Sequence, residues 1–140
     1  MDKFIVKGPS KIKGKVSISG SKNAALPILA ATILFDKEVI IKNLPRVKDI
    51  DTMINLLKSL GSEIKFNKDK KVIKITKKKK QKVFAPYSLV RTMRAGILVL
   101  GALVSKHQKS ITSLPGGCLI GARPVNYHLN ALKKLGMRYN

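Results

Sequence analysis

The sequence is poor in the residues that form disulfides and metal sites. It has one cysteine, Cys118, and two histidines, His107 and His128. A single thiol cannot form an internal disulfide, and so few sulfur and imidazole ligands do not make a zinc site. We therefore expect no metal and no cofactor, and we expect the protein in the cytoplasm, where thiols stay reduced.

Long apolar segments and targeting signals are lacking as well. The longest mainly apolar run covers residues 24–35, contains Pro27, and falls short of the ~20 residues that a membrane-spanning helix needs. The first four residues do not begin a secretory signal, which has a basic region and then an apolar one. At 140 residues and 44% apolar, the chain has enough hydrophobic residues for an ordered core. The sequence predicts a globular protein without a membrane partner.

Acidic residues are few, and positive charge dominates. Lys and Arg number 29 against 7 Asp and Glu, for a formal net charge of +22. Such a charge suggests a small basic nucleic-acid-binding protein, which we keep as an alternative function. However, most of the basic residues are lysines, aromatic residues make up only 5%, and the densest lysine run, 77–82, has no aromatic residue for base stacking. The run is more typical of a solvated loop, and we do not expect nucleic acid as a partner.

The acidic residues end early in the chain. Asp69 is the last of them, so residues 70–140 contain no carboxylate side chain. A reaction that needs a carboxylate base in this region must therefore obtain it from elsewhere.

Helical and strand-like patterns alternate along the chain. Apolar periodicity and turn residues predict helices over residues 22–34, 50–60, 88–104 and 124–135. Alternating or β-branched runs predict strands over residues 4–6, 16–19, 39–41, 64–66, 72–75 and 110–114. This order indicates a mixed α/β (α+β) protein.

The two halves of the chain resemble each other. A Leu-Pro pair ends at Pro45 and again at Pro115, an offset of 70, whereas a Leu-Gly pair ends at Gly61 and again at Gly136, an offset of 75. The second copy therefore contains 75 − 70 = 5 additional residues, which fall within 116–123. This segment holds Cys118 between glycines, which permit hinge motion. The chain is thus predicted to consist of units of about 70 residues, the second of them incomplete.

Cations recur where the predicted helices begin. Lys22, Arg94 and Arg123 each lie near a helix start, where the helix dipole disfavours positive charge. Taken singly, each is more readily explained as an exposed side chain. Together they suggest a shared anion site, and near these cations the Cys118 thiol would ionise more readily. The alternative for Cys118 is a small buried hydrophobic residue.

Several motifs resemble the UDP-N-acetylglucosamine 1-carboxyvinyltransferase family of enolpyruvyl transferases. They comprise Gly20-Ser21-Lys22-Asn23-Ala24-Ala25-Leu26-Pro27, Ala85-Pro86-Tyr87, Thr92-Met93-Arg94-Ala95, Leu114-Pro115-Gly116-Gly117-Cys118 and Ile120-Gly121-Ala122-Arg123-Pro124-Val125. The resemblance runs along the whole chain, and the Pro-Gly-Gly-Cys loop is the most specific motif. The related family that acts on shikimate 3-phosphate shares the fold but lacks this cysteine loop.

The resemblance implies a reaction and a set of site residues. The enolpyruvyl group of phosphoenolpyruvate would move to the 3-hydroxyl of UDP-N-acetylglucosamine with release of phosphate, the first committed step of peptidoglycan synthesis. Cys118 would be the catalytic residue, donating a proton to the enol methylene and able to form a covalent adduct. Lys22 and Asn23 would bind phosphoenolpyruvate. The expected UDP-N-acetylglucosamine site consists of Arg94, Arg123, Pro124, Val125, Asn126 and Tyr127. Asn126 stands where the family usually has Asp, and Tyr127 where it usually has an aliphatic residue.

The resemblance also implies a domain organisation. The family fold is an inside-out α/β barrel with two similar domains of three repeats each, much longer than this chain. Residues 1–21 would form strands that pack on the second domain, and residues 22–140 would form about two repeats of the first domain. The remaining part of such an enzyme carries the aspartate base and a further arginine. We therefore expect this chain to be inactive alone, as a truncated product or as the partner of a separate chain that supplies the rest.

Overall fold

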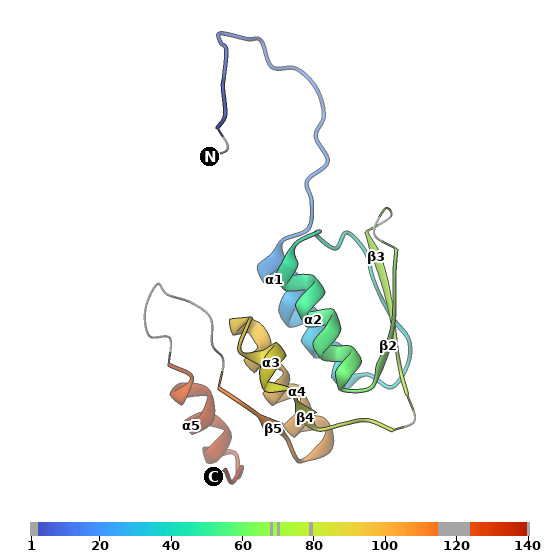
Figure 1. The fold of residues 1–140 in the computed structure, drawn as a ribbon, viewed down its shortest axis with the longest axis vertical. Coiled ribbons are helices and arrows are strands. Elements are labelled where there is room, and N and C mark those ends of the chain that lie inside the picture. Colours follow the sequence, from blue (N-terminus) through green and yellow to red (C-terminus); the bar gives the residue numbers. More distant parts are fainter. Residues whose placement is uncertain (1–2, 68, 70, 79, 115–123, 140) are drawn as a thin grey trace.

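A computed structural model describes residues 3–67, 69, 71–78, 80–114 and 124–139, and statements below concern these residues. The described chain forms two successive α/β units (Figure 1). We call residues 22–77 the first repeat and residues 84–134 the second repeat. The first contains α1 (Lys22–Ala31), η1 (Thr32–Leu34), β1 (Val39–Ile41), α2 (Lys48–Ser59), β2 (Ser62–Asn67) and β3 (Val72–Lys77). The second contains β4 (Phe84–Ala85), α3 (Tyr87–Val90), η2 (Arg94–Ile97), α4 (Leu98–His107), β5 (Ile111–Thr112) and α5 (Asn126–Lys134).

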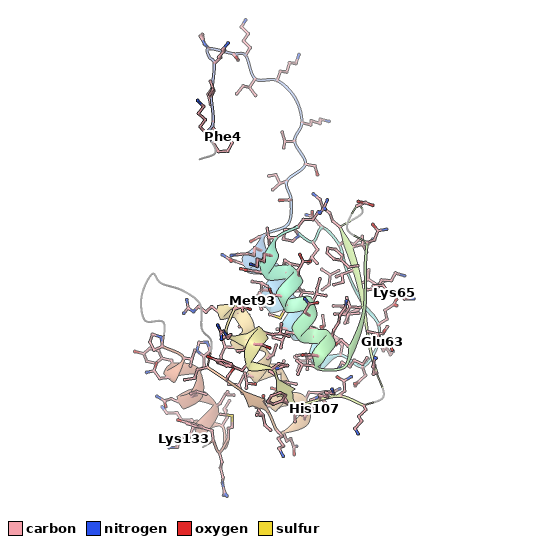
Figure 2. The ribbon with its side chains drawn as sticks, in the orientation of Figure 1. Phe4, Glu63, Lys65, Met93, His107 and Lys133 are labelled. Atoms are coloured by element: carbon pink, nitrogen blue, oxygen red, sulfur yellow. The ribbon has the colours of Figure 1, made fainter. Side chains whose placement is uncertain are left out.

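The first repeat is a helix pair that packs against an antiparallel sheet. Its strand order is β1-β3-β2, and in this register Ile75 lies opposite Val39 on one side and opposite Ile64 on the other. Ile73 and Ile75 are buried, whereas Lys74 between them is exposed, as the two-residue period of a strand requires. Figure 2 shows Lys65 projecting from the face of the sheet that is turned away from the helices. The alternation therefore fixes which face of the hairpin meets α2.

The second repeat pairs its strands differently. β4 and β5 are parallel, with Phe84 opposite Ile111, and the helical segments between them form the crossover. The sequence did not predict β4, because two residues are too short for a periodic signal. In Figure 1, α5 and the β2–β3 hairpin lie at opposite sides of the remaining helices.

One hydrophobic core joins the two repeats. Its largest completely buried side chains come from α1, α2, β3 and the loop between β1 and α2 in the first repeat, and from α3 and α4 in the second. They are Leu29, Leu44, Ile50, Met53, Leu56, Leu57, Ile73, Ile75, Val90, Val99 and Leu103. No residue of α5 is buried to this degree. The core therefore lies around α1 and α2, and α5 stands outside it.

The predicted helix over residues 88–104 is wrong as a single element. The structure has a short helix, α3, then a turn at Arg91–Met93, then η2 and α4. Pro86 rather than Ser88 is the residue before the first turn. Gly96 packs so closely on Val90 that an added Cβ would lie 3.1 Å from the Val90 Cα. This break allows α3 and η2 to pack against each other. The apolar pattern of the sequence does not indicate the break, because it results from tertiary packing.

The strands predicted at residues 4–6 and 16–19 are absent from the described N-terminal segment. Residues 3–20 form an extended arm that leaves the body of the protein near α1 (Figure 1). Its large apolar side chains are 75–99% exposed; they are Phe4, Ile5, Val6, Ile12, Val16 and Ile18. An isolated segment has no ladder to join, and a strand is stable only when its backbone groups pair.

Charged residues connect the two repeats at the end of η1. Lys77 donates a hydrogen bond from Nζ to the Ile33 carbonyl oxygen, and Lys106 Nζ lies 3.5 Å from the Leu34 carbonyl oxygen. Asp36 Oδ1 lies 2.6 Å from Lys106 Nζ and 3.9 Å from Lys77 Nζ. The hydrogen bond and charge of Lys106 lower the pKa of Asp36, and partial burial lowers the pKa of Lys77. We call Asp36, Lys77 and Lys106 the junction cluster.

None of the described helices is long and apolar enough to cross a membrane.

Candidate functional site

The predicted phosphoenolpyruvate residues lie at the start of α1. Lys22 and Asn23 are its first two residues, and both are exposed. Ser21 has the extended backbone of a helix N-cap, and its carbonyl oxygen accepts a hydrogen bond from Ala25 N at 3.0 Å, although its hydroxyl makes no capping bond. Because Leu26 and Leu29 anchor the next turns in the core, the first turn of α1 presents Lys22 and Asn23 to solvent.

Lys22 is held by an acidic residue from a neighbouring helix. Its Nζ lies 2.9 Å from Oδ2 of Asp49, the second residue of α2. The two side chains are 46% and 38% exposed, so the ion pair is worth at most ~1 kcal/mol. Its main consequence is geometric, because it joins the N-terminal ends of α1 and α2. Asp49 also offsets part of the positive charge that Lys22 places at the start of α1.

The backbone before α1 is pinned to the loop between β1 and α2. Gly20 N donates a hydrogen bond to Asn43 Oδ1 at 3.2 Å. A Cβ at Gly20 would lie 2.0 Å from the Asn43 carbonyl oxygen, so only glycine fits at this close approach. Asn43 itself has φ 58°, a left-handed conformation that asparagine tolerates. This contact fixes the position of Lys22 relative to the start of α2.

Sequence reasoning missed two charged residues at this end of the molecule. Lys48 and Asp49 open α2, whereas apolar periodicity alone set the predicted helix start at Ile50. The signal that identified Lys22, a cation in the first turn of a helix, applies equally to Lys48. A small hollow of about 270 Å³ adjoins this helix start. It is lined by Arg46, Val47, Lys48, Asp51 and Phe66.

The joined helix ends have the character of an anion site. The positive ends of two helix dipoles, with Lys22 and Lys48 beside them, favour phosphate or carboxylate, whereas Asp49 and Asp51 in the first turn of α2 oppose it. Asp49 neutralises part of this charge and holds Lys22 in place. The arrangement can therefore bind a small anion by charge-assisted hydrogen bonds.

Arg94 lies on a different element. It is the first residue of η2, is exposed, and stands just before α4, which packs against α1. Met93 and Gly96 on either side are buried and hold the turn in place, and Figure 2 labels Met93 at this turn. Arg91 lies apart from Arg94, because it directly follows α3 and its guanidinium carbon lies 5.5 Å from the centre of the Tyr87 ring. That contact is a cation–π interaction.

The start of α5 holds most of the predicted sugar-nucleotide residues. Asn126 and Tyr127 open the helix, preceded by Pro124 and Val125. Tyr127 is 76% exposed and Val125 is half-buried. Arg123 and Cys118 lie outside the described residues, so nothing is stated of their structure.

The structure brings some of these residues together and leaves others apart. Lys22 and Asn23 adjoin Asp49, but in the part of the chain described here neither makes a hydrogen bond or ion pair with Arg94, Asn126 or Tyr127. Of the three cations predicted to share an anion site, Lys22 and Arg94 lie on different elements and Arg123 lies outside the described residues, so the shared site stays a prediction. Within the described ranges, no group of three or more metal-binding side chains is close enough to hold an ion.

Comparison with known proteins identifies the family. The model of the EPSP synthase (3-phosphoshikimate 1-carboxyvinyltransferase) family matches residues 6–140. A UDP-N-acetylglucosamine 1-carboxyvinyltransferase from Pelagibacter ubique is 63% identical over 139 residues, which are 99% of this chain and 33% of that protein. Proteins of the same name from Pseudothermotoga lettingae and Escherichia coli are 47% and 49% identical. The chain spans about a third of the length of these relatives.

A solved structure supports the fold. The enolpyruvyl transferase NikO from Streptomyces tendae aligns with a TM-score of 0.73 at 19% identity, covering 92% of this chain and 28% of that one. This similarity confirms the predicted α/β fold of the enolpyruvyl transferase type. The relatives give no support to the nucleic-acid alternative. The chain, matched along nearly its whole length, belongs to the EPSP synthase family.

Proposed function

We propose that this chain forms part of an enzyme that transfers the enolpyruvyl group of phosphoenolpyruvate to the 3-hydroxyl of UDP-N-acetylglucosamine. The observation that carries the proposal is the joined start of α1 and α2, where the exposed Lys22 and Asn23 open α1 and Lys48 opens α2. Relatives up to 63% identical carry the name of this activity. In bacteria this reaction begins peptidoglycan synthesis, and we expect the enzyme in the cytoplasm, where the Cys118 thiol stays reduced.

In the proposed mechanism, Lys22 and Asn23 hold the phosphate and carboxylate of phosphoenolpyruvate. The sugar 3-hydroxyl oxygen bonds to the central carbon of the enol while its methylene carbon takes a proton from the Cys118 thiol. The hydroxyl proton passes to a base of the completed site. Phosphate then leaves with the electron pair of its C–O bond, and the new methyl group gives one proton to a base, which restores the double bond. Cations at the phosphate stabilise the charge that separates during these steps.

The second substrate is assigned to the other repeat. Arg94, Arg123 and the stretch from Pro124 to Tyr127 would bind UDP-N-acetylglucosamine. Support comes from the exposure of Arg94, Asn126 and Tyr127, which leaves them accessible to a ligand. Asn126 in place of an aspartate removes one acceptor charge, so we expect more of the contacts there to come from the backbone.

The described residues after Asp69 contain no acidic side chain, and neither does the rest of that region of the sequence. A base for the sugar hydroxyl would therefore come from the remaining two thirds of a family enzyme. We propose that this chain alone does not turn over, and that a polypeptide with the remaining part, in the same or a separate chain, completes the site.

The test is a phosphate-release assay with both substrates. The purified chain alone should release no phosphate above background, and addition of the remaining part of the Pelagibacter ubique relative should restore release. In the restored enzyme, Lys22→Gln should lower kcat/KM at least ~100-fold, since a charge-assisted contact to the transition state is lost. Lys134→Gln, an exposed cation at the far end of α5, is the matched control and should have no effect. Turnover by the chain alone, or equal activity of the two variants, would contradict the proposal.

Cys118 offers an independent test. An epoxide that mimics phosphoenolpyruvate should alkylate the thiol, and UDP-N-acetylglucosamine should accelerate the labelling, as detected by mass spectrometry. Labelling at the same rate with and without the sugar nucleotide would show that Cys118 is not part of the proposed site.

A further inference from the structure

The segment that leads into β4 exposes every second side chain. Lys80, Lys82 and Phe84 are exposed. Val83 between them is partly buried, and Ala85 is buried. A two-residue period is characteristic of extended backbone, so the three exposed side chains lie on one face.

β5 repeats this pattern beside β4. Lys109 and Ile111 are exposed, and Thr112 is partly buried. Phe84 lies opposite Ile111 in the parallel pair, and Ile111 N donates a hydrogen bond to the Val83 carbonyl oxygen at 2.8 Å. Residues opposite each other in neighbouring strands share a face, so Phe84 and Ile111 lie side by side, each two residues after a lysine. We call the following residues the ribbon face: Lys80, Lys82, Phe84, Lys109 and Ile111.

The ribbon face is positively charged and contains no carboxylate. Asp69 is the last acidic residue of the sequence, so neither β4 and β5 nor the segments that lead into them contain one. The sheet of the first repeat differs, although the exposed Lys65 lies opposite the exposed Lys74 there. Glu63, two residues before Lys65, is exposed on the same face and offsets part of that charge. Positive charge without a compensating acid therefore distinguishes the ribbon face from the other sheet.

Two large apolar side chains lie among these lysines. Phe84 is 53% exposed and Ile111 is 51% exposed. Ammonium groups beside exposed apolar side chains are typical of surfaces that bind anionic lipid bilayers. On such a surface, lysines contact lipid phosphates, and apolar side chains enter the boundary between headgroups and acyl chains.

The ribbon face lies away from the start of α1. Lys82 N donates a hydrogen bond at 3.0 Å to the carbonyl oxygen of Leu60, which directly follows α2, whereas Lys22 pairs with Asp49 at the start of α2. The 12 residues of α2 separate these two ends by roughly 18 Å, at a rise of about 1.5 Å per residue. In Figure 1, the start of α1 and β4 lie at opposite ends of α2. A bilayer at the ribbon face therefore leaves Lys22 open to small anions.

We propose that the ribbon face is a peripheral docking surface for an anionic lipid bilayer. Lys80, Lys82 and Lys109 contact the lipid phosphates, and Phe84 and Ile111 enter the interface between headgroups and acyl chains. The sequence predicts no membrane partner because it lacks a spanning segment, but a contact at headgroup level needs no such segment. The proposal is independent of the proposed catalytic function.

Nucleic acid is a less suitable polyanion for this face. Binding of single strands depends on aromatic side chains on which successive bases stack. Phe84 is the only aromatic member of the ribbon face, and Ile111 beside it has no ring. A lipid interface accommodates both side chains.

The N-terminal arm is a second lysine-rich segment with exposed apolar residues. Lys11 and Lys13 alternate there with Ile12, and all three are exposed. In extended backbone this alternation places lysines and apolar side chains on opposite sides, whereas the ribbon face has both on one side. The ribbon face therefore offers both contacts to one surface at the same time.

The test measures sedimentation of the purified chain with lipid vesicles. Vesicles of phosphatidylcholine with roughly 30% phosphatidylglycerol should bind the chain at least ~10-fold more tightly than vesicles of phosphatidylcholine alone, because only the former carry a net negative charge. The triple variant Lys80→Gln, Lys82→Gln and Lys109→Gln should weaken binding to the anionic vesicles at least ~10-fold.

A second triple variant, Lys42→Gln, Lys65→Gln and Lys74→Gln, is the matched control. It removes the same charge from exposed positions in and beside the sheet of the first repeat. Because salt screens charges that are not at the contact, it should bind within ~3-fold of the unmodified chain. Melting curves of both triple variants check that each retains the fold.

A fluorescent probe locates the contact. The chain has no tryptophan, so Phe84→Trp introduces a single indole at the ribbon face. Its emission should shift to shorter wavelength with anionic vesicles, because the indole enters the membrane interface. Ile40→Trp, at a 48% exposed position of β1, should show no shift.

Three results would overturn the proposal. The first is equal vesicle binding by the two triple variants, which would assign binding to another segment such as the arm. The second is an unshifted emission from Phe84→Trp on bound vesicles. The third is tighter binding to a single-stranded oligonucleotide through the same three lysines, which would assign the face to nucleic acid. None of these measurements depends on turnover, so an inactive enzyme would count against the proposed function and not against this docking surface.

Discussion

The two repeats carry matching apolar patterns but different degrees of packing. In the first, α2 is wedged between α1 and the hairpin, and its apolar face is buried. In the second, α5 repeats part of this face, with Leu129 and Leu132 in place of Ile54 and Leu57, yet both leucines are only half-buried. The comparison teaches that amphipathic periodicity specifies a helix and the face it will bury, while burial itself depends on a partner element.

The largest expected difference concerns one matched pair. Leu57→Ala should lower the free energy of unfolding by about 2–5 kcal/mol, because a completely buried leucine leaves a cavity. Its counterpart Leu132→Ala should cost less than ~1 kcal/mol, since that side chain is only partly buried. Urea denaturation of both variants gives the two values. Equal losses would show that the second repeat is as well packed as the first.

A pair of glycines gives the next largest contrast. Gly20→Ala should destabilise the protein by about 1–3 kcal/mol, because the new Cβ would meet the Asn43 carbonyl oxygen. Gly101→Ala in α4 has nothing within 4 Å of its Cβ and should be neutral or stabilise by up to ~1 kcal/mol. Thermal unfolding distinguishes the two. A neutral Gly20→Ala would mean that the arm moves freely away from Asn43.

The junction cluster predicts a pH dependence of stability. The pKa of Asp36 is lower in the folded protein than its ordinary value of 3.8, so its ionised form favours folding. This contribution is present above pH 3.8 and is lost as the pH falls through the lowered pKa. Asp36→Asn should therefore reduce the melting temperature at neutral pH and flatten its decrease in acid. Melting curves across the acid range check this, with Asp51→Asn, which makes no ion pair in the described structure, as control.

The smallest effect on stability is expected at the proposed site. Lys22→Gln or Asp49→Asn should each change the free energy of unfolding by no more than ~1 kcal/mol, because the pair is partly exposed. The double variant should show a coupling energy of the same small size. A coupling well above this value would indicate that the ion pair stabilises the first repeat rather than positioning Lys22 for a ligand.

The first repeat was the more predictable part of the chain. The helix predicted over residues 50–60 and the strands predicted over residues 64–66 and 72–75 follow from local patterns and are confirmed as α2, β2 and β3. The break between α3 and α4 was not predictable, because the apolar run is continuous and only the close packing of Gly96 on Val90 interrupts the helix. The strands predicted over residues 4–6 and 16–19 are absent for a related reason. An alternating apolar pattern favours a strand, but it does not supply the neighbouring strand with which its backbone must pair.

The site was predictable in part. The motif at Gly20–Pro27 and the position of Lys22 in the first turn of α1 were evident from residue type and order. The ion pair with Asp49 and the close approach of Gly20 to Asn43 were not, because each joins residues more than 20 positions apart in the chain. The roles of Cys118 and Arg123 remain predictions from the sequence motif.

By itself, the sequence determined the mixed α/β class, the internal repeat, the family motifs and the absence of carboxylates after Asp69. These are properties of local pattern and composition, which any copy of the chain carries in whatever environment it folds. The tertiary structure alone decided that α1 and α2 begin side by side, that Asp49 holds Lys22, and that the apolar face of α5 stays open. Such features depend on contacts between distant segments, and a contact forms only where a packed partner removes apolar surface from water or places opposite charges in reach.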